Sequence, residues 1–191
     1  MGLRSIAAVL PASFGRSVRA NLFPPQLVLR LADADGEAAS VKIGSTPPKR
    51  ARNYHLSVLN ERCWFPATEV RGVLLQVEKR GPNDAFRVAW RGEVQIGWRN
   101  GERLPPTRTI GWAEYAHFFS VVEGVGLRLN LLTEPPDLPL AWLGASTLLL
   151  TLQARASEVD SPPLRTKVDW DGNWHPGETE MGQHLKVAHT G

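Results

Sequence analysis

The sequence has one cysteine, no long apolar run and no acidic side chain before Asp33. The single cysteine, Cys63, excludes an intramolecular disulfide and a cysteine-rich zinc module. No apolar stretch approaches the ~18 residues that a membrane-spanning helix requires, so the sequence predicts no transmembrane segment. Glycine (17) and proline (15) are frequent, but below the share typical of low-complexity disorder. The 191 residues suit one well-buried core rather than two.

The N-terminal segment differs from the rest of the chain. Residues 1–24 are predicted to form a poorly ordered arm, and residues 25–191 a single domain. The apolar run Ile6–Leu10 is stopped by Pro11, whereas a secretory signal needs an unbroken run of ~7–15 residues. A cytoplasmic location is therefore slightly favoured, while membrane association or export stays open.

The net charge of +3 is unevenly distributed. Basic residues exceed acidic ones over residues 1–60, and acidic residues exceed basic ones over residues 131–191. The one dense basic cluster, Lys49-Arg50-Ala51-Arg52, has only three charges. Tight binding of nucleic acid needs many phosphate contacts, so the sequence argues against nucleic acid as a partner.

Beyond residue 25 the hydrophobic pattern alternates with a period of two, which is typical of half-buried strands. Examples are Tyr54–Leu59, Val70–Val77 and Leu164–Trp170, and the Thr/Leu-rich run Thr147–Ala156 is the strongest strand segment. We expect roughly nine to eleven short strands, with turn signals at the ~8–12-residue spacing of an antiparallel sandwich or barrel. At most a helical turn or two is expected, within residues 1–20 or 112–119. The predicted fold class is all-β.

Two groups of motifs resemble a known family. The first group is Tyr54-His55-Leu56-x-Val58-x-Asn60 with Ala67, Val70 and Leu74; the second is Gln153–Ala156, Asp160-Ser161-Pro162, Trp170-Asp171-Gly172-x-Trp174, Met181 and His184-Leu185, with Arg108–Gly111 between them. Together they resemble uncharacterised bacterial proteins with an immunoglobulin-like β-sandwich domain, over roughly residues 50–188. That resemblance implies an antiparallel immunoglobulin-like β-sandwich without assigned chemistry. In that family the domain often follows a membrane-anchoring helix, and this sequence has no such helix.

Tryptophan is unusually frequent, with seven residues. They could form a ligand-stacking face, or they could fill core and edge positions of an all-β domain. Trp98 and Trp112 each follow a glycine beside a predicted loop, so we expect them to be exposed and name them as candidate ligand-binding residues.

Candidate metal ligands are weak. Asp169, Asp171, Asn173 and Glu180 match oxygen-donor positions of a calcium loop, but Trp174 stands where the loop needs glycine. No histidine pair has the spacing that aligns two imidazoles on one strand or helix. We therefore expect no metal and no cofactor.

No catalytic residue can be named. Cys63 has no signature of a nucleophile around it, and Gly144-Ala145-Ser146-Thr147 lacks the second glycine of a nucleophile elbow. The function predicted is a non-enzymatic binding or accessory module with an unknown protein partner. The alternative is a carbohydrate-binding module that uses exposed tryptophans, and the third possibility is an enzyme of unknown class.

Overall fold

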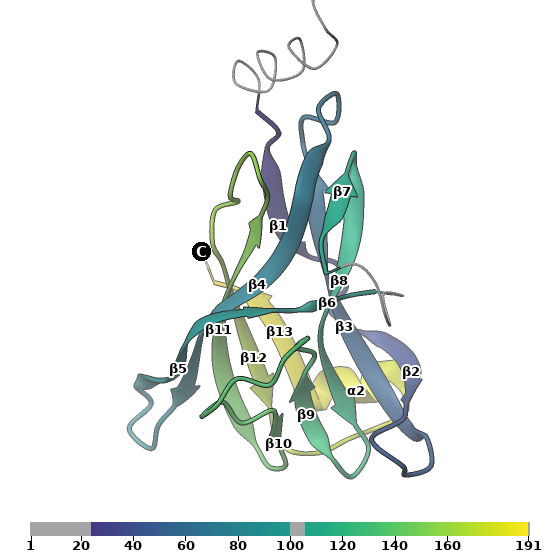
Figure 1. Cartoon of the computed structure of the whole chain (residues 1–191). Helices are drawn as coiled ribbons and strands as arrows, with labels where there is room; N and C mark the ends of the chain where they lie inside the picture. Colours follow the sequence, from purple (N-terminus) through teal and green to yellow (C-terminus); the bar gives the residue numbers. More distant parts are fainter. Residues whose placement is uncertain (1–23, 100–105, 191) are drawn as a thin grey trace, which may run out of the picture.

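The computed structural model describes residues 24–99 and 106–190, which form two antiparallel β-sheets in a β-sandwich-like arrangement (Figure 1). The predicted arm lies outside the described residues, apart from Pro24. Within the described part, no helix is long and apolar enough to cross a membrane.

One sheet has seven strands built around β3. Its members are β1 (Leu27–Leu31), β2 (Glu37–Val41), β3 (Lys49–Asn60), β6 (Gly97–Trp98), β8 (Ala113–Val122), β9 (Gly126–Leu129) and β10 (Ala141–Trp142). The order is β1-β3-β8-β9-β10, with β2 also pairing with β3 and β6 also pairing with β8. β1 and β2 therefore pair with different lengths of β3, and β6 and β9 with different lengths of β8.

The other sheet has six strands. Its members are β4 (Ala67–Arg80), β5 (Phe86–Gln95), β7 (Arg108–Ile110), β11 (Ser146–Arg155), β12 (Leu164–Trp170) and β13 (Leu185–His189), and a short helix, α2 (Glu178–His184), precedes β13. The order is β13-β12-β11-β4-β5, with β7 also pairing with β4. β5 is largely exposed, and its charged side chains discourage edge-to-edge pairing.

One hydrophobic core lies between the sheets. In β11 the alternating leucines Leu148, Leu150 and Leu152 are fully buried, as the period-two pattern predicts. From the opposite sheet Tyr54 and Phe119 stack with ring centroids 4.5 Å apart. Residues from both sheets belong to the same buried cluster, so the two sheets share one interior.

The all-β, two-sheet architecture predicted from the sequence is confirmed. The described part contains 13 strands, so the expected count of nine to eleven is not confirmed. The expected helical turn at residues 112–119 is wrong, because Ala113–Val122 forms β8 between β3 and β9. The helix at Glu178–His184 was not predicted.

Candidate functional site

The most exposed tryptophans lie at one end of the sandwich. Trp64 is 77% exposed in the β3–β4 loop, and Trp112 is 67% exposed in the turn between β7 and β8. Both loops lie at the narrow end of the domain, near the start of β1 (Figure 1, top). We call the surface formed by Trp64, Trp112 and their two loops the tryptophan tip.

A single buried side chain holds the tip together. Asn60, which is 1% exposed, donates from Nδ2 to the carbonyl oxygens of Phe65 (2.7 Å) and Ile110 (3.3 Å). Its Oδ1 accepts hydrogen bonds from the backbone amides of Gln26 and Arg62, both at 3.2 Å. Its own backbone N–H donates to the carbonyl oxygen of Trp112 at 2.8 Å. Asn60 therefore ties the loops that carry both tryptophans to the beginning of β1.

The expected exposure of Trp112 is confirmed, whereas the expected exposure of Trp98 is wrong. Trp98 is only 5% exposed and belongs to the buried core. It lies in β6, opposite Ala116 of β8, so strand pairing turns its ring inward. Its Nε1–H donates to the carbonyl oxygen of Pro106 at 3.0 Å, which satisfies the buried indole.

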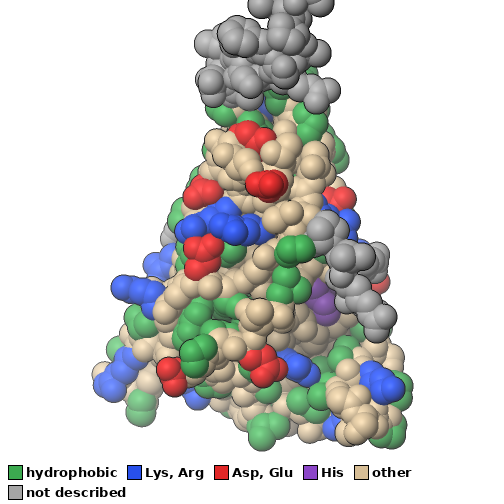
Figure 2. Space-filling view, in the orientation of Figure 1, with side chains coloured by type: hydrophobic (Ala, Val, Ile, Leu, Met, Phe, Trp, Pro, Cys, Tyr) green, Lys and Arg blue, Asp and Glu red, His purple; other side chains and the backbone are tan. Residues whose placement is uncertain are grey.

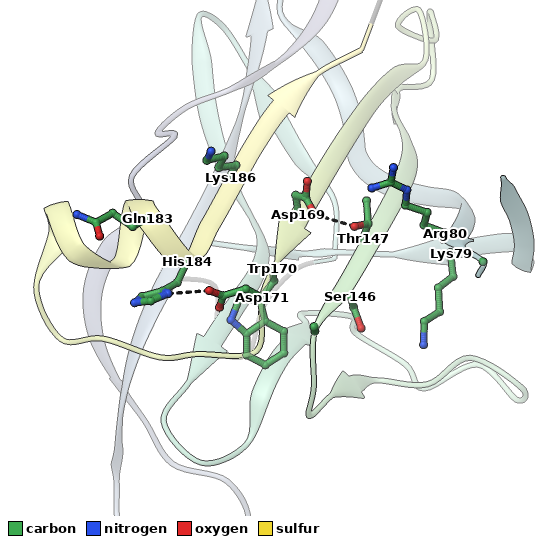
Figure 3. Close-up of a pocket in the computed structure, with 12 residues that line it drawn as sticks. Lys79, Arg80, Ser146, Thr147, Asp169, Trp170, Asp171, Gln183, His184 and Lys186 are labelled. Atoms are coloured by element: carbon green, nitrogen blue, oxygen red, sulfur yellow. Dashed lines mark hydrogen bonds and ion pairs between the residues drawn. The ribbon is translucent and has the colours of Figure 1, made fainter. Parts of the chain in front are cut away.

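A hollow of about 460 Å³ lies at the end of the six-stranded sheet (Figure 3). In it, His184 Nδ1 is 2.8 Å from Asp171 Oδ2, and Thr147 donates to Asp169 at 2.6 Å. The hydrogen bond from Thr147, aided by Lys167, lowers the pKa of Asp169. Figure 3 shows Ser146 on the other side of Trp170 and Asp171 from His184, so these two do not form a nucleophile–base pair.

The candidate metal ligands are not brought together. Asp169 bonds Thr147 and Lys167, while Asp171 bonds His184 and the backbone amide of Asn173. Glu180 lies on α2, and its carboxylate faces His175 at 3.9 Å. Over residues 24–99 and 106–190, no three histidine, cysteine, aspartate or glutamate side chains are placed to hold a metal ion.

A larger hollow than that of Figure 3 lies on the outer face of the seven-stranded sheet. This histidine groove, of about 760 Å³, is lined by Glu37, Ala38, Ala39, Ser40, Val41, Lys42, Asn53, His55, Gly97, Trp98, Arg99, His117, Asn130 and Leu131. A bulge in β8 shapes it: Tyr54 pairs with Phe119, and the next residue, His55, pairs with His117. Because the bulge skips Phe118, His55 and His117 reach the same outer face, with ring centroids 5.1 Å apart.

A polar network fixes one wall of the groove. The Ser120 hydroxyl donates to Asn53 Oδ1 at 2.8 Å and accepts a hydrogen bond from Asn130 Nδ2 at 3.0 Å. His117 Nε2 is 3.2 Å from the same oxygen. Since the one hydroxyl proton goes to Asn53, His117 Nε2 must be the protonated nitrogen. Ser120 is buried, and its hydroxyl donates its only proton and accepts hydrogen bonds within this network, so it is not available as a nucleophile.

Both groove histidines resist protonation. Burial, together with the charges of the neighbouring His55 and Arg99, lowers the pKa of His117 to about 4. Burial and Arg99 also lower the pKa of His55, although Glu37 opposes this. At neutral pH both imidazoles are therefore uncharged, with lone pairs available for a ligand.

This shift predicts a dependence of stability on pH. Between pH 6.5 and 4 the unfolded chain binds a proton that folded His117 does not, so the free energy of unfolding falls as the pH falls through this window. The loss is about 2 kcal/mol, and urea denaturation at pH 7, 5.5 and 4.5 measures it. His117→Gln is expected to flatten this slope, whereas His189→Gln, on β13, keeps it. Equal slopes in wild type and His117→Gln would contradict the assignment.

On the face of the molecule seen in Figure 2, basic and acidic side chains are interspersed, and no large region carries charge of one sign. Several of them are paired, for example Arg50 with Glu123 and Arg99 with Glu37, each at 2.7–2.8 Å. Arg50, from the basic cluster of the sequence, also lies over the ring of Trp174, 4.9 Å from its centroid. That face therefore has no continuous basic surface that could bind a nucleic-acid phosphate backbone.

Comparison with protein-family models, with curated proteins and with solved structures finds no match to this chain. The family resemblance of residues 50–188 therefore stays a prediction.

Proposed function

We propose that this protein is a non-enzymatic binding or accessory module, an immunoglobulin-like β-sandwich that contacts a protein partner through its tryptophan tip. The observation that carries the proposal is the placement of Trp64 and Trp112, both largely exposed, in two loops that Asn60 joins. Exposed aromatic side chains on an ordered scaffold are the groups that dominate binding energy at protein interfaces.

The chemistry of the other hollows supports a binding role over catalysis. In the hollow of Figure 3, His184 and Asp171 pair without Ser146 in reach. In the histidine groove, the Ser120 hydroxyl already donates to Asn53. Nucleophilic catalysis needs a hydroxyl or thiol beside a base, and in neither hollow is a serine hydroxyl placed to give its proton to a histidine. The Thr147 hydroxyl donates to Asp169, but the lowered pKa of Asp169 makes it a weak base.

Site-specific photo-crosslinking tests the proposal. A photoreactive phenylalanine derivative is placed at position 64, 112 or 143 of the full chain, and extracts of the source cells are irradiated. Leu143 is the matched control because it is 76% exposed but lies between β10 and β11, at the opposite end of the sandwich. We expect one protein to crosslink at positions 64 and 112 and not at 143. The purified partner should bind Trp64→Ala/Trp112→Ala at least tenfold more weakly than wild type.

Crosslinking that is equal at all three positions, or a double variant that binds as wild type, would overturn the proposal. Carbohydrate binding is the second candidate, because sugar rings stack on exposed tryptophan. A glycan array separates the two: binding to one glycan class, lost in Trp64→Ala/Trp112→Ala, would replace the protein partner with a carbohydrate.

A further inference from the structure

The two histidines of the groove have a spacing that suits a shared metal ion. His55 and His117 face each other on neighbouring strands, and their ring centroids are 5.1 Å apart with the planes tilted by 34°. A zinc ion lies about 2.0–2.1 Å from each imidazole nitrogen, so two imidazoles in tetrahedral coordination have centroids roughly 5 Å apart. The pairing of β3 and β8 thus places the two rings at a separation compatible with a shared metal ion.

The surrounding polar groups prepare His117 as a ligand. Its Nε2–H is held by the Ser120 hydroxyl, which leaves the Nδ1 lone pair free. Such an outer hydrogen bond fixes the tautomer and orientation of metal-binding histidines. His55 is 5% exposed and lines the same groove, so its ring is also restrained by packing.

The carboxylate of Glu37 lies beside the histidine pair, but Arg99 holds both of its oxygens, so it does not complete a three-ligand site. Glu37 Oε2 is 3.9 Å from His55 Nδ1, but the same oxygen is 2.8 Å from Arg99 Nη2. Arg99 therefore competes with a cation in two ways: it holds Glu37, and its positive charge repels the metal. Removal of the Arg99 charge should tighten binding.

We propose that His55 and His117 together bind a divalent transition-metal cation of the zinc type, with water in the remaining positions. The site has two neutral nitrogen ligands from adjacent strands, a combination that suits zinc, copper and nickel rather than calcium or magnesium. The proposal is independent of the tryptophan tip, which lies at the narrow end of the domain, away from this groove.

The test is a titration of the full chain with zinc chloride at pH 7, followed by the imidazole ¹⁵N signals in NMR spectra. Before zinc is added, we expect His117 as the Nε2–H tautomer. Zinc should then shift the nitrogens of His55 and His117, with Nδ1 of His117 moving most, and leave those of His189 unchanged. Calorimetry on the same sample gives the affinity, and magnesium chloride is the control cation.

Four variants make the assignment specific. His55→Gln and His117→Gln should each weaken zinc binding at least tenfold, and His189→Gln should leave it unchanged. Arg99→Gln should strengthen it several-fold, a gain that a merely misfolded variant would not show. The proposal is overturned if wild type binds no zinc at 1 mM, a concentration on the order of the weakest affinities usually measured. It is equally overturned if zinc shifts histidines other than this pair, or if Arg99→Gln binds no more tightly than wild type.

Discussion

Gly126→Ala is expected to lower the free energy of unfolding by about 4 kcal/mol. Gly126 begins β9 with φ +95°, a conformation that costs an L-residue about 1–2 kcal/mol. A Cβ placed there would lie 2.1 Å from the carbonyl oxygen of Trp142 in β10 and 2.9 Å from the ring of Trp170. Overpacking of this kind adds a further 1–3 kcal/mol, because neither a paired backbone nor a buried indole can easily move.

Gly182→Ala is the matched control for this substitution. Gly182 lies in α2, and a Cβ there would meet nothing within 4 Å. Alanine is about 1 kcal/mol more favourable than glycine in a helix, so this variant should be as stable as wild type or slightly more so. Urea denaturation of both variants measures the difference, and equal midpoints for Gly126→Ala and wild type would refute the prediction.

Local patterns were enough to predict most strands. Leu164–Trp170 was expected as a strand and forms β12 with the same bounds, and Thr147–Ala156 corresponds to β11 with a shift of one residue. In β12 every second side chain is buried, so the alternation can be read from the sequence, and in β11 only the buried Leu149 interrupts it. The two-sheet architecture follows, since strands with one apolar face must bury it against another layer.

The histidine groove could not be predicted in the same way. His55 and His117 are 62 positions apart, so no spacing within one element connects them. They meet because β3 pairs with β8 and because a bulge shifts the register beside Tyr54. Register and bulges depend on long-range pairing, which an isolated stretch of sequence does not reveal.

The burial of the tryptophans was also not predictable from local sequence alone. Trp98 was expected outside because it follows Gly97, but pairing with Ala116 directs its ring into the core. Trp64 was overlooked as a binding residue, although it stands in Cys63-Trp64-Phe65-Pro66, an apolar stretch between two strands. An apolar loop that follows a polar strand-ending residue such as Asn60 is a signal that would have indicated an exposed aromatic site.

Asn60→Ala is expected to destabilise the domain by about 3 kcal/mol and to weaken partner binding by the tryptophan tip. The substitution removes two donated and two accepted hydrogen bonds. It leaves backbone groups of three segments without these partners, of which the Ile110 bond is buried and the others are partly buried. Each unsatisfied buried group costs about 1–3 kcal/mol, although water can reach some of them at the end of the sandwich. Partner crosslinking at position 64 should fall even though Trp64 and Trp112 are both present, because their loops lose the side chain that joins them.

The variant Asn60→Asp keeps a side chain of the same size but lacks the Nδ2–H donor, so it measures the effect of losing the donor alone. The carboxylate keeps the bonds from Gln26 and Arg62 but directs negative charge at the carbonyl oxygens of Phe65 and Ile110. The pKa of this new carboxyl should therefore be raised, so its deficit against wild type is largest at pH 7 and shrinks as the pH falls and a donor returns. Asn83→Ala, in the exposed β4–β5 turn, should change stability by less than about 0.5 kcal/mol at either pH. If Asn60→Ala were as stable as Asn83→Ala, Asn60 would not organise the tip, and the placement of the two tryptophan loops at one end of the domain would need another cause.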